Sequence, residues 1–214
     1  MSLAWFGLKT IIFKQKKPIL GTIILTDYCN LSCKHCAVNN IKRKMQSYEK
    51  VLEEMHNCYR DGIRILFFCG GETLLWEDQG RTIKDLIREG RKIGFYLINV
   101  VTNGTIDLNL PEADLVFLSL DGMRETHNLI RGDTFDTIMK NLELAKDTNI
   151  CIYMAVNKLN YKEIEKVGRL AKEHPRVNSI SFNLHTPYQG TEALSLSREE
   201  KIETIERIKS MVKQ

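Results

Sequence analysis

Three of the six cysteines lie within one eight-residue segment. Cys29, Cys33 and Cys36 have the spacing C-x3-C-x2-C. Three thiolates can take three corners of a cubane iron–sulfur cluster, which normally has four cysteine ligands. Because this segment has no fourth cysteine, one iron would remain open to a substrate or cofactor, as the open position does in catalytic zinc sites. The spacing therefore predicts a catalytic metal centre.

Zinc is the alternative for the same thiolates. A structural zinc ion takes four ligands, and His35 could supply the fourth, which would make the chain a zinc-binding interaction module. However, His35 directly precedes Cys36, an awkward spacing for two ligands of one tetrahedral ion. A disulfide is less expected, because clustered cysteines are more typical of an intracellular metal site. The spacing alone leaves both an iron–sulfur centre and a zinc centre open.

The composition is that of an ordinary globular chain. Of its 214 residues, 43% are hydrophobic and 27% are charged, a balance that suits one domain with a full core. The net charge of +4 is spread along the chain, and there is no sequence evidence for a nucleic-acid-binding module. The sequence also has no apolar run of membrane-spanning length and no recognisable signal peptide. We expect a cytoplasmic protein.

Six segments are predicted to be strands, and a helical pattern follows every one except the third. The strands are Ile19–Thr26, Ile63–Phe68, Phe95–Val101, Leu115–Leu120, Ile150–Val156 and Ile180–Leu184. The helices are Tyr48–Asp61, Gln79–Ile93, Phe135–Lys146, a segment from Asn160 that ends before Pro175, and a final segment from Ser197. This alternation indicates an α/β fold with a parallel sheet, either a partial barrel or a doubly wound sheet.

Polar or glycine-rich segments follow five of these strands. They are the cysteine segment, Gly70–Glu72, Thr102–Gly104, Ser119–Gly122 and Asn183–Pro187. In parallel α/β folds, ligands bind at the carboxyl ends of the strands. We therefore expect these five segments to form one site.

With these segments in place, the sequence resembles the radical S-adenosylmethionine (SAM) superfamily. The C-x3-C-x2-C segment follows the first strand and GGE follows the second, in that family's order and at a similar separation. The TNG and SLDG…H…RG stretches are most similar to the branch with molybdopterin-biosynthesis, peptide-maturation and hopanoid-type enzymes. The resemblance runs from about Ile19 to the final helix. It implies a partial (β/α)6 barrel similar to a TIM barrel.

The resemblance implies an enzyme in which Cys29, Cys33 and Cys36 bind a [4Fe–4S] cluster whose open iron binds SAM. Reductive cleavage of SAM would give a 5′-deoxyadenosyl radical that abstracts hydrogen from an unknown substrate, such as a peptide, a cofactor precursor or a lipid. The expected partner is an electron donor such as flavodoxin or ferredoxin. No cysteine follows Cys151, so we expect a minimal core without the auxiliary-cluster extension of many peptide-modifying relatives.

The family's motifs also assign four residues to the amino group and adenine of SAM. Gly70, Gly71 and Glu72 match the motif that holds the amino group, because glycines allow close backbone approach and a carboxylate accepts from an ammonium. The family more often has proline after GGE, where this chain has Thr73. His35 stands at a position that is commonly aromatic in the family and packs beside the adenine.

Four further residues match positions that contact the ribose and carboxylate of SAM. Thr102, Asn103 and Ser119 stand at strand ends where relatives bind the ribose hydroxyls, although Asn103-Gly104 is also a common turn pair. Arg131 matches an arginine that pairs with the SAM carboxylate, a bidentate task that suits a guanidinium. A salt bridge within the protein is the alternative for Arg131.

Residues 1–18 are predicted to be a leader, and residues 19–214 the radical SAM core domain. The leader combines lysines with apolar side chains, namely Trp5, Phe6, Ile11, Ile12 and Phe13. Such a segment either packs across the bottom of the barrel or forms an interfacial amphipathic helix that contacts a membrane surface.

Overall fold

Six parallel strands form one open sheet in this computed structural model, which describes residues 7–8, 11–12, 17–38, 41–42 and 44–212. The strand order is β1-β2-β5-β6-β7-β8, and β1 and β8 are the edges. Each strand of this sheet therefore lies beside the next one of the same sheet along the chain, while β3 and β4 form a separate hairpin. The bounds are Leu20–Thr26 (β1), Ile65–Gly70 (β2), Leu97–Thr102 (β5), Leu115–Ser119 (β6), Ile150–Val156 (β7) and Val177–Leu184 (β8). All six predicted strands are confirmed.

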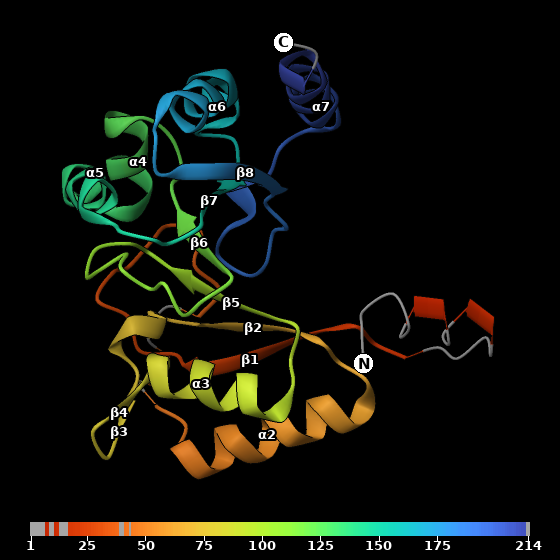
Figure 1. Ribbon diagram of the computed structural model, residues 1–214. Helices are drawn as coiled ribbons and strands as arrows, with labels where there is room; N and C mark the ends of the chain where they lie inside the picture. Colours follow the sequence, from red (N-terminus) through yellow and green to blue (C-terminus); the bar gives the residue numbers. More distant parts are fainter. Residues whose placement is uncertain (1–6, 9–10, 13–16, 39–40, 43, 213–214) are drawn as a thin grey trace.

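The helices lie along the outer side of this curved sheet, with α2 and α3 on β1 and β2 and with α4 to α6 near β6 to β8 (Figure 1). The bounds are Tyr48–Asp61 (α2), Ile83–Ile93 (α3), Arg124–Arg131 (α4), Phe135–Leu144 (α5), Ile164–Glu173 (α6) and Arg198–Val212 (α7). Shorter elements are the 3-10 helices η1 (Thr73–Leu75), η2 (Tyr161–Glu163) and η3 (Glu192–Leu194), and the hairpin of β3 (Glu77–Asp78) and β4 (Arg81–Thr82). The predicted α/β fold with a parallel sheet and outer helices is confirmed.

The predicted helix near Gln79–Ile93 begins later than expected. Gln79 and Gly80 have φ angles of 52° and 76°, and they form the tight turn between β3 and β4. Two successive positive φ angles suit a two-residue hairpin turn and not a helix. The helix begins at Ile83, where the Thr82 N–H donates to the Asp85 carboxylate over 2.9 Å as part of a capping box.

Helix α4 is absent from the predicted elements. It is only eight residues long, and its N-cap, Met123, has no side-chain capping bond. Helices this short are not stable on their own in water, so tertiary packing must hold α4 in place. The side chains of His127 and Ile130 supply that packing, because both are buried against the body of the domain.

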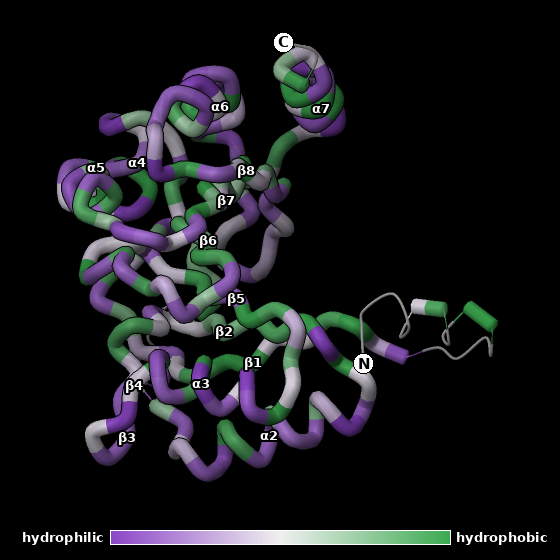
Figure 2. The backbone as a smooth tube through the Cα atoms, in the orientation of Figure 1, coloured by the Kyte–Doolittle hydropathy of each residue, from purple (hydrophilic) through white to green (hydrophobic). Residues whose placement is uncertain are grey.

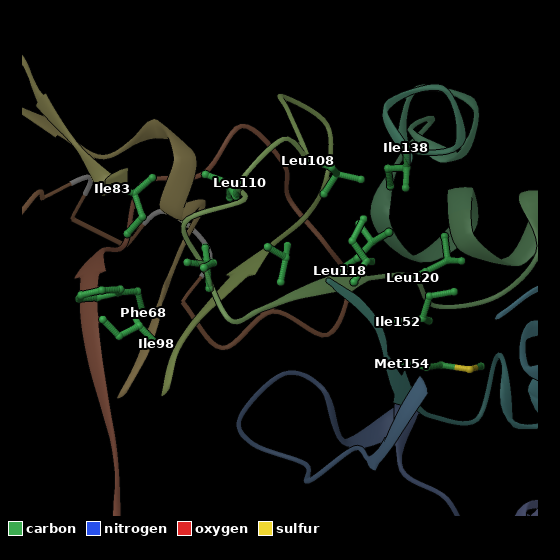
Figure 3. Packing of buried hydrophobic residues seen from close by; sticks show 14 of the residues in the cluster. Phe68, Ile83, Ile98, Leu108, Leu110, Leu118, Leu120, Ile138, Ile152 and Met154 are labelled. Carbon is green, nitrogen blue, oxygen red and sulfur yellow. The ribbon is translucent and has the colours of Figure 1, made fainter. Parts of the chain in front are cut away.

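The hydrophobic core lies between the sheet and the outer helices (Figure 3). Strand side chains that point toward the helices are fully buried, including Leu66, Phe68, Ile98, Leu118 and Ile152. In Figure 2, strands such as β1 and β5 are largely apolar, whereas the helices alternate between apolar and polar residues. Burial of each such side chain contributes about 1.5–3 kcal/mol, so this layer dominates the stability of the sheet.

The other face of the sheet carries the alternate strand residues and is less covered. We call it the inner face. Its residues on the four central strands include Phe67, Cys69, Asn99, Val101, Phe117, Ser119, Cys151, Tyr153 and Ala155. The Phe67 and Phe117 ring centroids are 5.3 Å apart, and those of Phe117 and Tyr153 are 5.8 Å apart. All three rings are half-buried, which leaves an aromatic surface on the inner face.

Most of the leader's apolar residues, Trp5, Phe6 and Phe13, lie outside the described residues. Ile11 and Ile12 are described, and their side chains are 76% and 61% exposed. Figure 1 draws the described pieces of the leader as short red ribbons apart from the sheet. None of the helices in the described ranges is long and apolar enough to cross a bilayer.

Candidate active site

The cysteine segment begins three residues after the end of β1. The backbone N–H of Leu31 donates to the Cys29 sulfur over 3.4 Å, and the N–H of Cys36 donates to the Cys33 carbonyl over 3.1 Å. Burial raises the pKa of the Cys33 thiol to about 11, opposed by the positive charge of Arg131. The Cys36 and Cys29 thiols raise it further, so the three sulfurs lie within electrostatic range of one another.

Gly70 and Gly71 fit against this segment because they have no side chains. A Cβ atom on Gly71 would lie 2.0 Å from the Tyr28 carbonyl oxygen, and one on Gly70 would lie 2.2 Å from the Thr26 oxygen. Because the two segments lie this close, two backbone hydrogen bonds form between them. The Gly71 N–H donates to the Thr26 carbonyl over 2.7 Å, and the Glu72 N–H donates to the Tyr28 carbonyl over 2.8 Å. The end of β2 is thereby joined to the start of the cysteine segment.

The carboxylate of Glu72 is fully buried where three strands end. The Thr102 hydroxyl donates to Oε1 over 2.7 Å, and the backbone N–H groups of Leu74 and Asn103 donate over 3.0 and 2.7 Å. Burial raises the pKa of Glu72, and these three donors oppose the rise. No Lys or Arg in the described part of the chain forms an ion pair with it, so a buried carboxylate is held by neutral donors.

Asn103 connects the third strand end to the cysteines. Its Nδ2 group donates to Asn30 Oδ1 over 2.8 Å and lies 3.7 Å from the Cys29 sulfur. Thr102 and Asn103 are therefore brought to the site as expected, but their side chains contact Glu72 and the cysteine segment. Their assignment to the ribose hydroxyls stays a prediction.

Arg131 contacts the cysteine segment, and Ser119 lies on the strand beside β5. Ser119 ends β6 and is buried. Arg131, the last residue of α4, lies with its Nε 2.5 Å from Asp121 Oδ2 and its Nη1 3.7 Å from the Cys33 sulfur. Its side chain is 10% exposed and that of Asp121 is fully buried, so this is a buried ion pair. The contact of Arg131 with the SAM carboxylate stays a prediction.

His35 lies between Arg131 and Asp121. Its Nε2 is 3.4 Å from both Arg131 Nη2 and Asp121 Oδ2. Burial lowers the pKa of His35 to about 4, so the ring is neutral at pH 7. Its Nδ1 is buried and has no hydrogen-bond partner among the described residues. A bound ligand could satisfy that nitrogen, which fits the expected position of His35 beside the adenine.

Two further residues belong to the site and were not assigned from the sequence. Asp121 lies in the SLDG stretch. The sequence signal that could have identified it is a carboxylate directly after an apolar strand, with an arginine, Arg131, later in the same stretch. Tyr188 donates its hydroxyl to the His35 carbonyl. Nothing local to Tyr188 marks it, because the two residues are far apart in the sequence.

The cysteine geometry can be compared with the two metal centres that the spacing left open. No three His, Cys, Asp or Glu side chains in the described ranges converge as a single ion would require. A tetrahedral zinc ion holds each thiolate at about 2.3 Å, whereas a cluster binds each one at a different iron. The described side chains therefore contain no preformed tetrahedral site for a single ion.

Comparison with known proteins favours the iron–sulfur alternative over the zinc module. The profile of the Radical SAM superfamily matches residues 23–171. The chain is 29% identical to Fe-coproporphyrin III synthase of Methanosarcina barkeri over 192 residues. That alignment covers 83% of this chain and 46% of the synthase. Over 204 residues it is 25% identical to the sporulation killing factor maturation protein SkfB of Bacillus subtilis, with 87% and 48% covered.

A solved structure has the same fold. Streptococcus suis SuiB bound to S-adenosylmethionine matches with a TM-score of 0.78 and 15% identity over 99% of this chain and 52% of that one. This chain thus spans about half the length of these relatives. The chain belongs to the radical SAM superfamily, a class of enzymes that use a [4Fe–4S] cluster and SAM.

Proposed function

We propose that this chain holds a [4Fe–4S] cluster through Cys29, Cys33 and Cys36 and binds SAM beside Glu72. Reductive cleavage of SAM there would yield a 5′-deoxyadenosyl radical that takes a hydrogen atom from a substrate. The observation that carries this proposal is the buried Glu72 carboxylate, which Asn103 links directly to the cysteine segment.

Glu72 supports the proposal because no Lys or Arg among the described residues pairs with it directly, and only the more distant charge of Arg131 acts on it. A buried carboxylate is costly unless it is paired, and the three donors around Glu72 are neutral. The SAM ammonium group would supply the missing positive charge through charge-assisted hydrogen bonds. Thr102 and Asn103 then act by holding the carboxylate in place, while the unsatisfied His35 Nδ1 and the buried Ser119 are available to the nucleoside.

Anaerobic reconstitution with iron and sulfide tests the proposal. We expect wild-type protein to become brown and, after reduction, to release 5′-deoxyadenosine from SAM. Cys33→Ala should lose the chromophore, whereas Cys58→Ala, which changes a half-buried cysteine of α2, should keep it. Stoichiometric zinc without iron uptake would instead support the zinc-binding module. An electron donor such as flavodoxin or ferredoxin is part of the proposal, because the cluster must be reduced.

The substrate group that meets the radical is expected to be uncharged. None of the inner-face residues is charged, and Phe67, Phe117 and Tyr153 present aromatic surface there. Burial raises the pKa of the inner-face Cys69 thiol to about 11, so that residue is neutral as well. A neutral aromatic probe, N-acetylphenylalanine amide, should bind the wild type more tightly than Phe117→Ala. Preferential binding of GTP by the reconstituted protein would contradict this expectation.

A further inference from the structure

Arg131 contacts three different groups of the site with its three nitrogens. Nε lies 2.5 Å from the Asp121 carboxylate, Nη1 lies 3.7 Å from the Cys33 sulfur, and Nη2 lies 3.4 Å from His35 Nε2. A guanidinium can do this because its donors are fixed in one plane and point in different directions. Only 10% of the side chain is exposed, so the geometry is enclosed by protein.

Asp121 is itself held firmly. Its Oδ1 accepts from the backbone N–H of Ala155 over 2.7 Å, at the end of β7. Its carbonyl accepts from the Asn160 amide over 3.0 Å, and its N–H donates to His127 Nδ1 over 3.2 Å. Asp121 is therefore joined to β7, to the segment that follows β7 and to helix α4, and it is a rigid anchor for Arg131.

The neighbouring residue of α4 contacts the same segment. The Ile130 carbonyl accepts from the Lys34 backbone N–H over 2.9 Å. Two successive residues at the end of α4 thus bind two successive residues of the cysteine segment, Cys33 and Lys34. The position of Cys33 is determined by α4 as well as by the strand that precedes it.

We propose that Arg131 is a positioning residue for the iron–sulfur centre, held by Asp121, and that its N–H···S bond to Cys33 raises the reduction potential of the cluster. This inference rests on the proposed function. Hydrogen bonds to ligand sulfur, and a nearby positive charge, stabilise the reduced form of a cluster because reduction adds negative charge.

The test compares reconstituted wild type with Arg131→Lys, which keeps the charge but loses the planar fork, and with Arg131→Gln, which loses the charge. Arg124→Gln is the matched control, since Arg124 is on the same helix in an exposed ion pair with Asp136. The readout is the midpoint potential from a redox titration followed by electron paramagnetic resonance, together with SAM affinity. Circular dichroism checks that each variant folds. If Arg131→Gln does not fold, the comparison of wild type with Arg131→Lys still tests the inference.

We expect a shift to more negative potential for Arg131→Lys, a larger shift for Arg131→Gln and no shift for the control. Wild-type potential in both Arg131 variants, with or without weaker SAM binding, would overturn the inference. A wild-type chain that forms no [4Fe–4S] signal at all would overturn the proposed function instead, so the two failures are distinguishable.

Discussion

At the scale of single residues, Glu72 is the side chain that most strongly favours a cationic ligand in the site. Its carboxylate is buried, accepts from three donors that come from two strand ends, and lacks an ionic partner among the described residues. Such a group is stable only if the fold holds it firmly, and it favours a cationic ligand.

Glu72→Gln should therefore weaken SAM binding while it preserves the size of the side chain. Loss of a charge-assisted bond worth about 1.5–3 kcal/mol corresponds to a Kd about 10 to 150 times higher. Titration of the reconstituted protein with SAM measures the effect, and Glu77→Gln, at an exposed position, is the control. Unchanged affinity in Glu72→Gln would remove Glu72 from the SAM site.

His127 predicts how stability depends on pH. Its side chain is fully buried, and burial with the charge of Arg131 lowers its pKa to about 4. The unfolded chain binds this proton near pH 6.5 and the folded chain does not, so stability is present above pH 6.5 and is lost toward pH 4. At pH 5 the loss is about 2 kcal/mol.

Chemical denaturation of cofactor-free protein at pH 7 and pH 5 measures this loss. In His127→Gln the difference between the two pH values should be smaller, whereas His56→Gln, at an exposed position of α2, should behave like wild type. Equal losses in wild type and His127→Gln would show that His127 is protonated in the folded chain.

At the scale of elements, close contact between the end of β2 and the cysteine segment builds the site. Gly71→Ala would place a Cβ atom 2.0 Å from the Tyr28 carbonyl oxygen. We expect this variant to lose iron during gel filtration after reconstitution, because the two segments must separate. Gly80→Ala is the control, since its Cβ meets nothing within 4 Å and it carries only the cost of a φ of 76°, about 1 kcal/mol. Wild-type iron retention in Gly71→Ala would contradict the expectation.

Helix α4 shows the limit of prediction at the same scale. The six strands and the other helices have strong periodic patterns, and these patterns predict the elements well. Only two of α4's side chains, His127 and Ile130, are buried, so its sequence lacks such a pattern. Likewise, the start of α3 depends on the hairpin turn at Gln79 and Gly80, which a helical pattern does not reveal.

At the scale of the whole molecule, the strand order brings the five polar strand ends to one edge. Consecutive parallel strands are neighbours throughout the sheet, so residues from the first to the last strand meet there. Tyr188, after β8, thus reaches the carbonyl of His35, after β1, and the ring centroids of His185 and His35 are 6.3 Å apart. The site is a product of the entire fold.

The leader gives a prediction at this scale. Ile11 and Ile12 are exposed, and Figure 1 draws the described pieces of the leader apart from the sheet. This arrangement favours contact with another surface. We expect the full chain to sediment with vesicles that contain anionic lipid, and a chain without the residues before Pro18 to remain in the supernatant. Equal sedimentation of both chains would favour the alternative, in which the leader only packs on the barrel.

The sequence by itself determined the cysteine spacing, the succession of strands and helices, and the polar segments after five strands. These are local patterns, and they were sufficient for the family and for the candidate residues. The tertiary structure decided which of those residues contact one another. The Glu72 bonds to Thr102 and Asn103 join residues about 30 positions apart, and the contact of Arg131 with Cys33 spans 98 positions. Such pairs depend on strand order and helix packing, which no local pattern contains.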